Sequence, residues 1–206
     1  STLYINGAWV ASSDGAVREI RSPHDNSVVA TVSEATAADT RDAITAARES
    51  FDSGVYASWS MKDRCALVEK VADLVKRDAE ILASFETRDT CKRMVETRYD
   101  MADIEATFRH FASLGLKLKD RNVDVGADNI SSVITHEPVG VCALIGPWNY
   151  PLLQISWKVA PALVAGCSFI VKPSELSPST AIHLMKLLQE AGLPQGVANL
   201  ICGAGA

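Results

Sequence analysis

The segment from Gly146 to Pro151 has the composition of a rigid loop that holds one polar side chain. It reads Gly-Pro-Trp-Asn-Tyr-Pro, so prolines restrict the backbone on both sides of an aromatic residue and a primary amide. An amide held in one direction can donate two hydrogen bonds, as stabilisation of a developing oxyanion requires. Asn149 is therefore a candidate catalytic residue. The alternative is that Asn149 caps a helix beginning at Pro151, a common role for asparagine.

Two further polar segments could bind a nucleotide. Lys172-Pro173-Ser174-Glu175 places a cation near a carboxylate. A lysine can meet a phosphate or a ribose hydroxyl, and a carboxylate accepts bonds from ribose hydroxyls while repelling a 2′-phosphate. The alternative is a surface ion pair beside a turn. Gly203-Ala204-Gly205-Ala206 is a weaker signal, because any strand-to-helix turn can hold two glycines.

Each polar segment follows a predicted strand. Apolar runs cover residues 139–145, 168–172 and 197–202, as expected for strands buried on both faces. Helical patterns separate these runs, and the connections are short. This alternation predicts an α/β fold with a doubly wound, Rossmann-like parallel sheet and right-handed crossovers. Ligands of such sheets bind at the carboxyl ends of the strands, where the polar segments lie.

Two helices are expected between these strands. The first covers 151–164, begins with a proline in its first turn and is expected to bend at Pro161. The second is predicted to be capped by Ser177, with Pro178 at its first position and Gly192 at its end.

The N-terminal region is expected to begin with hairpins. Asn6-Gly7 supplies the two positive φ angles of a tight turn between Leu3–Ile5 and Trp9–Val10. A second strand pair is expected at 17–21 and 28–32.

Three or four helices should follow, each with an apolar stripe. Ser60 with Asp63 resembles a capping box at the start of one of them. The predicted core positions are Ala43, Ile44, Ala47 and Phe51; Leu67, Val71, Leu74 and Val75; Ile81, Leu82 and Phe85; and Met101, Ile104, Phe108, Phe111 and Ala112.

Residues 117–136 alternate between apolar and polar residues and lack the helical pattern of the segments before them. Two alternating runs, Leu116–Val125 and Ile130–His136, are joined by Gly126–Asn129 and predict a pair of half-buried strands. Strands without a thick core of their own often pair with a partner outside the domain. Edge-strand assembly between subunits is one interpretation, and packing on the chain's own helices is the other.

Composition narrows the class of protein. The 206 residues are 48% hydrophobic and 22% charged, as in a soluble globular domain. A net charge of -5 argues against nucleic acid or an anionic membrane as the main partner. Residues 1–10 do not resemble a secretory signal, and the most apolar stretch, 152–164, is interrupted by polar residues and proline. The five cysteines lack metal-ligand spacing and indicate reduced thiols in a cytoplasmic protein.

Several long motifs, in order along the whole chain, resemble the aldehyde dehydrogenase superfamily. The stretch from Trp148 to Lys172 is most similar to betaine-aldehyde and related amino-aldehyde dehydrogenases. The motifs are Ile5-Asn6-Gly7 with Trp9, His136–Val141, Pro147–Leu152, Trp157–Leu163, Gly166-Cys167, Lys172–Glu175, and Glu190–Pro194 followed by Gly196-Val197 and Asn199.

The resemblance implies roles for individual residues. Asn149 would donate its amide to the oxyanion of a thiohemiacetal, and Lys158 matches a lysine to which a proton relay is sometimes assigned. The alternative for Lys158 is an ordinary surface lysine. Lys172 and Glu175 would hold the adenosine ribose, which favours NAD and leaves NADP as an alternative. The implied cofactor-binding set is Ile145, Gly146, Pro147, Trp148, Asn149, Lys172, Ser174, Glu175 and Gly205.

A monovalent-cation site is also implied. Asp89 matches a residue that helps to hold such an ion, with backbone carbonyls near Ile20 and Leu176; the alternative for Asp89 is a helix cap. This sequence departs from the family pattern at Cys91, where glycine is usual, and near Met94. A turn that needs a positive φ would be strained by cysteine, so a local difference is expected there.

These observations predict three regions: N-terminal hairpins and helices at 1–116, oligomerisation strands at 117–136, and the first part of an NAD-binding sheet at 137–206. Together they predict an incomplete aldehyde dehydrogenase fold in a homo-oligomer, dimer or tetramer.

The implied reaction is oxidation of an aldehyde, betaine aldehyde or an amino-aldehyde among the candidates, to the carboxylic acid through a cysteine thioester. The nucleophile, the general base and the main glycine-containing nucleotide turn would follow Ala206, so these residues alone are expected to be inactive. The rivals are an acyl-phosphate reductase of the same superfamily and a short nucleotide-binding or assembly module.

Overall fold

Five strands form the sheet that carries the three polar segments. In this computed structural model, which describes residues 1–205, the strand order is β2-β1-β9-β8-β7. The strands β7, β8 and β9 are parallel, whereas β1 pairs antiparallel with both β9 and β2. The sheet is therefore mixed. The strands are β1 (Leu3–Ile5), β2 (Ala8–Val10), β7 (Val141–Ile145), β8 (Ser168–Lys172) and β9 (Ala198–Leu200).

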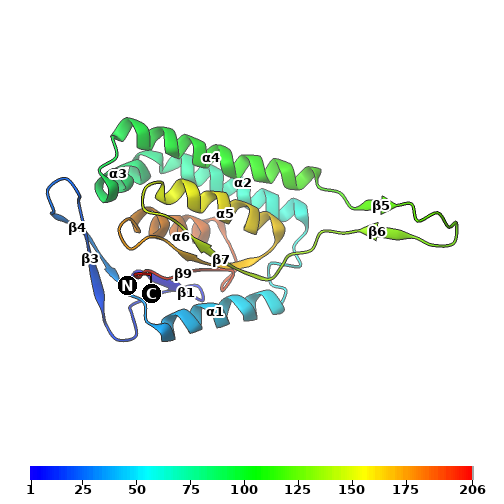
Figure 1. Cartoon of the computed structure of the whole chain (residues 1–206), viewed down its shortest axis with the longest axis horizontal. Helices are drawn as coiled ribbons and strands as arrows, with labels where there is room; N and C mark the ends of the chain where they lie inside the picture. Colours follow the sequence, from blue (N-terminus) through cyan, green and yellow to red (C-terminus); the bar gives the residue numbers. More distant parts are fainter. Residues whose placement is uncertain (206) are drawn as a thin grey trace.

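Helices cover both faces of this sheet, as in a doubly wound fold. The helix α1 packs on one face, while α5 and α6, the crossovers between the parallel strands, pack on the other with α2, α3 and α4 outside them (Figure 1). The helices are α1 (Ala37–Asp52), α2 (Met61–Arg77), α3 (Ala79–Thr90), α4 (Met94–Lys117), α5 (Pro151–Ala165) and α6 (Ser179–Ala191).

The first hairpin turns as its sequence predicts but extends the main sheet. Asn6 and Gly7 have φ angles of 50° and 79°. The β1 strand then pairs with β9, with Tyr4 opposite Leu200. The sequence showed the hairpin but not its partner, because pairing across the length of the chain leaves no local pattern.

The helices α1 and α2 both begin with side-chain caps. Thr36 and Asp39 form a reciprocal capping box at α1. At α2, Ser60 accepts from the Asp63 N–H as predicted, but the Asp63 carboxylate accepts from the Ser60 hydroxyl. Ile44 and Ile81, both predicted to face the core, are instead 49% and 48% exposed.

Two short strand pairs lie outside the main sheet: β3 (Val17–Arg21) with β4 (Val28–Ser33), and β5 (Arg121–Val123) with β6 (Ser132–Ile134). The β5–β6 hairpin projects far from the body of the molecule (Figure 1). Its strands are shorter than the predicted runs, and β5 is exposed along its whole length. Among residues 1–205, no helix has the length and apolarity to cross a membrane.

The helix α5, which follows the Asn149 segment, is held firmly at its C-terminal end. Its last carbonyls have no partners within the helix. The Tyr56 hydroxyl donates to the Leu163 carbonyl at 2.9 Å, and Arg64 Nε donates to the Val164 carbonyl at 2.9 Å. Gly166 ends the helix in the left-handed conformation, with φ 87°. Distant side chains thus cap the end of α5.

We expect Arg64→Met to lower the free energy of unfolding by at least about 1–3 kcal/mol, because the Val164 carbonyl at the end of α5 would lose its donor, as would the Trp59 carbonyl. Urea denaturation measures this difference. Arg98→Met is the matched control: Arg98 pairs with Glu80 in solvent, so its loss should change stability little. Equal effects of the two variants would contradict the capping role.

Candidate active site

The carboxyl ends of the three parallel strands meet at one edge of the sheet. The Gly146 N–H donates to the Lys172 carbonyl at 3.0 Å, just beyond the β7–β8 ladder. The Lys172 ammonium then donates to the Gly203 carbonyl at 2.8 Å, after β9. The three polar segments, distant in sequence, are therefore neighbours in space.

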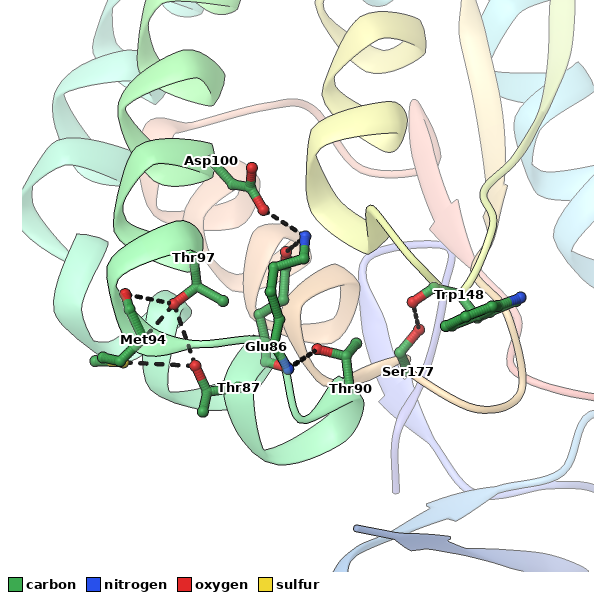
Figure 2. A network of polar contacts seen from close by, with 9 residues as sticks. Glu86, Thr87, Thr90, Met94, Thr97, Asp100, Trp148 and Ser177 are labelled. Carbon is green, nitrogen blue, oxygen red and sulfur yellow. Dashed lines mark hydrogen bonds and ion pairs between the residues drawn. The ribbon is translucent and has the colours of Figure 1, made fainter. Parts of the chain in front are cut away.

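Asn149 is exposed at the first of these strand ends. Tyr150 occupies the N-cap position of α5, and no side chain caps this helix. The capping role considered for Asn149 is thus not realised, and the residue is accessible from solvent. On one side, the segment is fixed by the Ser177 hydroxyl, which donates to the Trp148 carbonyl at 3.0 Å (Figure 2).

The second strand end offers a cation and a carboxylate that are not paired with each other. Lys172 donates to the carbonyls of Pro173 and Gly203, and within the described part of the chain it forms no salt bridge with Glu175. A lysine ammonium has three protons, so one remains for a ligand. Glu175 receives only a long bond, 3.4 Å, from the Ser174 hydroxyl. Both groups can therefore bind a polyhydroxylated ligand such as a ribose, Lys172 as a donor and Glu175 as an acceptor.

The third strand end is supported by two residues that sequence reasoning missed. The Ala204 N–H donates to Glu34 Oε1 at 3.1 Å, and Arg18 binds the same carboxylate at 2.6 and 2.7 Å. These hydrogen bonds from Arg18 lower the pKa of Glu34. Both residues belong to the β3–β4 region, and only their opposite charges hinted at a pair. Gly205 is exposed, and Ala206 lies outside the described residues.

A cavity of about 450 Å³ adjoins these strand ends and brings the predicted cation-site residues together. Ile20, Asp89 and Leu176 all line it, alongside Trp148 and Glu175. The cation site is thus compatible with the arrangement of the chain. Within residues 1–205, no cluster of three or more histidine, cysteine, aspartate or glutamate side chains is arranged to hold a metal.

Asp89 caps the start of α6 from another helix. Its carboxylate accepts from the Ser179 N–H at 3.0 Å and from the Ser179 hydroxyl at 2.9 Å. The predicted cap, Ser177, instead donates to Trp148, so that prediction was wrong. Burial raises the pKa of Asp89 to about 6, although the bonds from Ser179 act in the opposite direction.

Two further residues singled out in the sequence lie on α5 and at the end of α3. Lys158 is half-buried on α5, where its ammonium donates to the Gln154 carbonyl at 3.2 Å. Cys91 ends α3 in the left-handed conformation, with φ 57°, which is the geometry that glycine adopts without strain. The turn thus has the conformation that glycine favours, and the local difference expected at Cys91 is not found.

Three of the five cysteines are poorly suited to nucleophilic chemistry because they are buried. Cys65, Cys167 and Cys202 are buried, and burial raises the pKa of the Cys202 thiol to about 12. A thiol of this kind carries very little thiolate near neutral pH.

Comparison with known proteins places this geometry in context. Residues 9–206 match the aldehyde dehydrogenase family. A betaine aldehyde dehydrogenase from Bacillus subtilis is 45% identical over 205 residues, which span 100% of this chain and 42% of the relative. Human retinal dehydrogenase 2 is 38% identical over 98% of this chain and 39% of its own length.

A solved structure agrees with the fold. The crystal structure of betaine aldehyde dehydrogenase from Staphylococcus aureus in complex with NAD+ is 45% identical and superimposes with a TM-score of 0.96, over 98% of this chain and 40% of that one. This chain therefore spans about 40% of the length of these relatives.

We expect Asp89→Ala to destabilise the protein by about 0.5–2 kcal/mol, because the first turn of α6 would lose its acceptor. Thermal or urea unfolding measures the loss. Ser177→Ala is the control, and it should cost less because its hydroxyl does not cap the helix. A larger effect at Ser177 would contradict this assignment.

The same carboxyl predicts a pH dependence. Its pKa rises from 3.8 to about 6 on folding, so the native state binds this proton more tightly than the unfolded chain. The Asp89 contribution to the free energy of unfolding should therefore fall as pH rises from about 4 to 6. Subtracting the Asp89→Asn profile, measured in choline salts without small monovalent cations, isolates this contribution. A rising difference would contradict it.

Proposed function

This chain belongs to the aldehyde dehydrogenase family, and we propose that it forms the N-terminal, cofactor-binding part of an enzyme that oxidises an aldehyde to a carboxylic acid with NAD. The observation that carries the proposal is the meeting of three strand ends, which carry the exposed Asn149 together with Lys172 and Glu175. The nucleophilic cysteine and the general base are expected outside these residues.

The residues at the strand ends fit a dinucleotide. Lys172 and Glu175 would hold the adenosine ribose, since each retains hydrogen-bonding capacity. The segment from Ile145 to Trp148 would line the nicotinamide side, with Ser174 and Gly205 nearby. NAD, when bound, supplies the hydride acceptor. NAD+ in the staphylococcal structure supports this cofactor, and the Glu175 carboxylate favours it over NADP by charge repulsion.

Asn149 would act on the oxyanion. Its amide can donate to an oxygen on which negative charge develops when a thiolate adds to the aldehyde carbonyl. The same donor would stabilise the second tetrahedral species, formed when water attacks the thioester. Lys158, farther along α5, is proposed as a proton-relay group for these steps.

The substrate we propose is a cationic aldehyde such as betaine aldehyde. Betaine aldehyde dehydrogenases are among the similar proteins. A groove of about 440 Å³ beside α5 is lined by Trp157, which is 52% exposed, and by Phe111 and Asp103. Aromatic faces attract quaternary ammonium groups, and a carboxylate adds to that attraction.

The other inferences concern assembly and ions. The projecting β5–β6 hairpin exposes Val123, Val133 and Ile134, and we propose that it pairs with another subunit in a homo-oligomer.

Asp89, with the carbonyls near Ile20 and Leu176, is proposed to hold a monovalent cation at the cavity that these residues line.

In the full-length polypeptide, Asn149→Ala should lower kcat for aldehyde oxidation about 10²–10³-fold, the usual cost of losing one oxyanion donor. Reduction of NAD, followed at saturating aldehyde, measures this. The free energy of unfolding should not change, since Asn149 is exposed and caps nothing. An unchanged kcat would refute the assignment, and activity only with an acyl phosphate and NADPH would favour the reductase.

Trp157→Ala should raise KM for betaine aldehyde more than for 3,3-dimethylbutanal, its uncharged analogue of similar shape. A cation–π contact of about 1–2 kcal/mol predicts a roughly five- to thirtyfold difference between the two substrates. Steady-state kinetics in the full-length polypeptide gives the ratio. Equal changes for both substrates would show that Trp157 contributes only apolar contact.

A further inference from the structure

A buried lysine lies between two carboxylates close to the Asn149 segment. Lys92, in the turn between α3 and α4, donates to Asp100 Oδ2 at 2.5 Å and to Glu86 Oε1 at 3.3 Å (Figure 2). The Lys92 side chain is only 14% exposed, and that of Glu86 is fully buried. The cluster joins α3 to α4 through one ammonium group.

The same ammonium contacts the residue that follows Asn149. Lys92 Nζ lies 3.9 Å from the centroid of the Tyr150 ring, within the range of a cation–π interaction. Tyr150 is the N-cap of α5, with φ −132° and ψ 65°, and no side chain hydrogen-bonds this helix start. Its ring contact with Lys92 is therefore an important restraint on this side of Asn149.

On the other side of Asn149, the restraint is the Ser177 hydroxyl on the Trp148 carbonyl. The two residues that flank Asn149 are thus each held by a side chain from another part of the chain. The Lys92 contact comes from the α3–α4 turn and the Ser177 contact from the segment before α6. The backbone from which the Asn149 amide projects is therefore restrained on both sides.

This arrangement is costly for a purely structural cluster. Burying ionised groups is unfavourable, and apolar residues of similar volume often serve stability as well. Glu86 Oε2 is buried without a hydrogen-bond partner within residues 1–205. Burial also raises the pKa of Glu86 to about 7, despite the nearby ammonium. The ammonium offers the ring face an electrostatic attraction that an uncharged side chain of similar length does not supply.

We propose that Lys92 is a positioning residue for Asn149, acting through the Tyr150 ring. Asp100 and Glu86 aim the ammonium at the ring, the ring fixes the start of α5, and the preceding amide is held toward the oxyanion. This inference rests on the proposed function of Asn149. A small misplacement of a catalytic group can lower the rate by a large factor, so loss of Lys92 is expected to lower kcat.

The test compares Lys92→Met with Lys92→Arg in the full-length polypeptide. Lys92→Met keeps the stem and removes the charge, and it should lower kcat roughly ten- to a hundredfold while leaving KM for NAD unchanged. Lys92→Arg keeps a cation for the ring and should recover most of the loss. Lys76→Met is the control, because Lys76 pairs with Glu105 in solvent.

A double-mutant cycle separates positioning from general stabilisation. In the Asn149→Ala background, Lys92→Met should lower kcat no further, because no amide remains to be positioned. A structural role would multiply the two losses, and that result would overturn the proposal. If Lys92→Met does not fold, Tyr150→Leu removes the same contact from the other side and should give the same cycle.

A spectroscopic readout makes the proposal testable apart from activity. With 3-fluorotyrosine incorporated, the ¹⁹F resonance of Tyr150 should shift in Lys92→Met, while that of the buried Tyr56 stays in place. An unmoved Tyr150 resonance would overturn the proposal. A shifted resonance together with a silent Asn149→Ala variant would instead refute the proposed function and leave the Lys92–Tyr150 contact standing.

Discussion

The parallel pairing of β7 with β8 is the constraint on which the site depends. Parallel strands end at the same edge of a sheet, and the Gly146 N–H continues the ladder to the Lys172 carbonyl beyond the strands themselves. This bond puts the asparagine segment and the lysine–glutamate segment side by side. The Lys172 side chain then extends the arrangement to the third strand end. The pairing of the strands therefore brings the residues of the candidate site together, and the loops and helices that follow the strands orient them.

The features that could be predicted from the sequence are those with a local signature. The positive φ pair at Asn6-Gly7, the proline at the start of α5, and the buried strands β8 and β9 all follow from the local sequence. The prediction that residues 139–145 are buried on both faces was wrong: β7 lies at the edge of the sheet among the described residues, and Ile145 is 61% exposed. The convergence of the strand ends followed because the alternation of strands and helices has few topological solutions. The oxyanion candidate followed from the rigidity of its own segment and from the resemblance.

What could not be predicted is mostly polar contact across long sequence distances. Asp89 caps a helix that begins 90 residues later, and the predicted cap, Ser177, serves another carbonyl. Glu34 receives the N–H of Ala204, 170 positions away. The sequence shows which side chains can donate or accept a hydrogen bond, but it does not show which donor pairs with which acceptor. The pairs are known only once the chain is folded. The prediction for Ile44 was wrong because the face of α1 that packs against the rest of the protein is narrower than the apolar stripe of the helix.

The pairing of β1 with β9 has a consequence for how the chain is made. Tyr4 lies opposite Leu200, so β1 cannot pair with β9 until almost all of the residues described here have been synthesised. At bacterial or eukaryotic elongation rates this delay is on the order of ten seconds or more. During that time a short, apolar N-terminal hairpin remains without its neighbour. Until then this segment is open to nascent-chain chaperones, and the completed sheet would withdraw it from them.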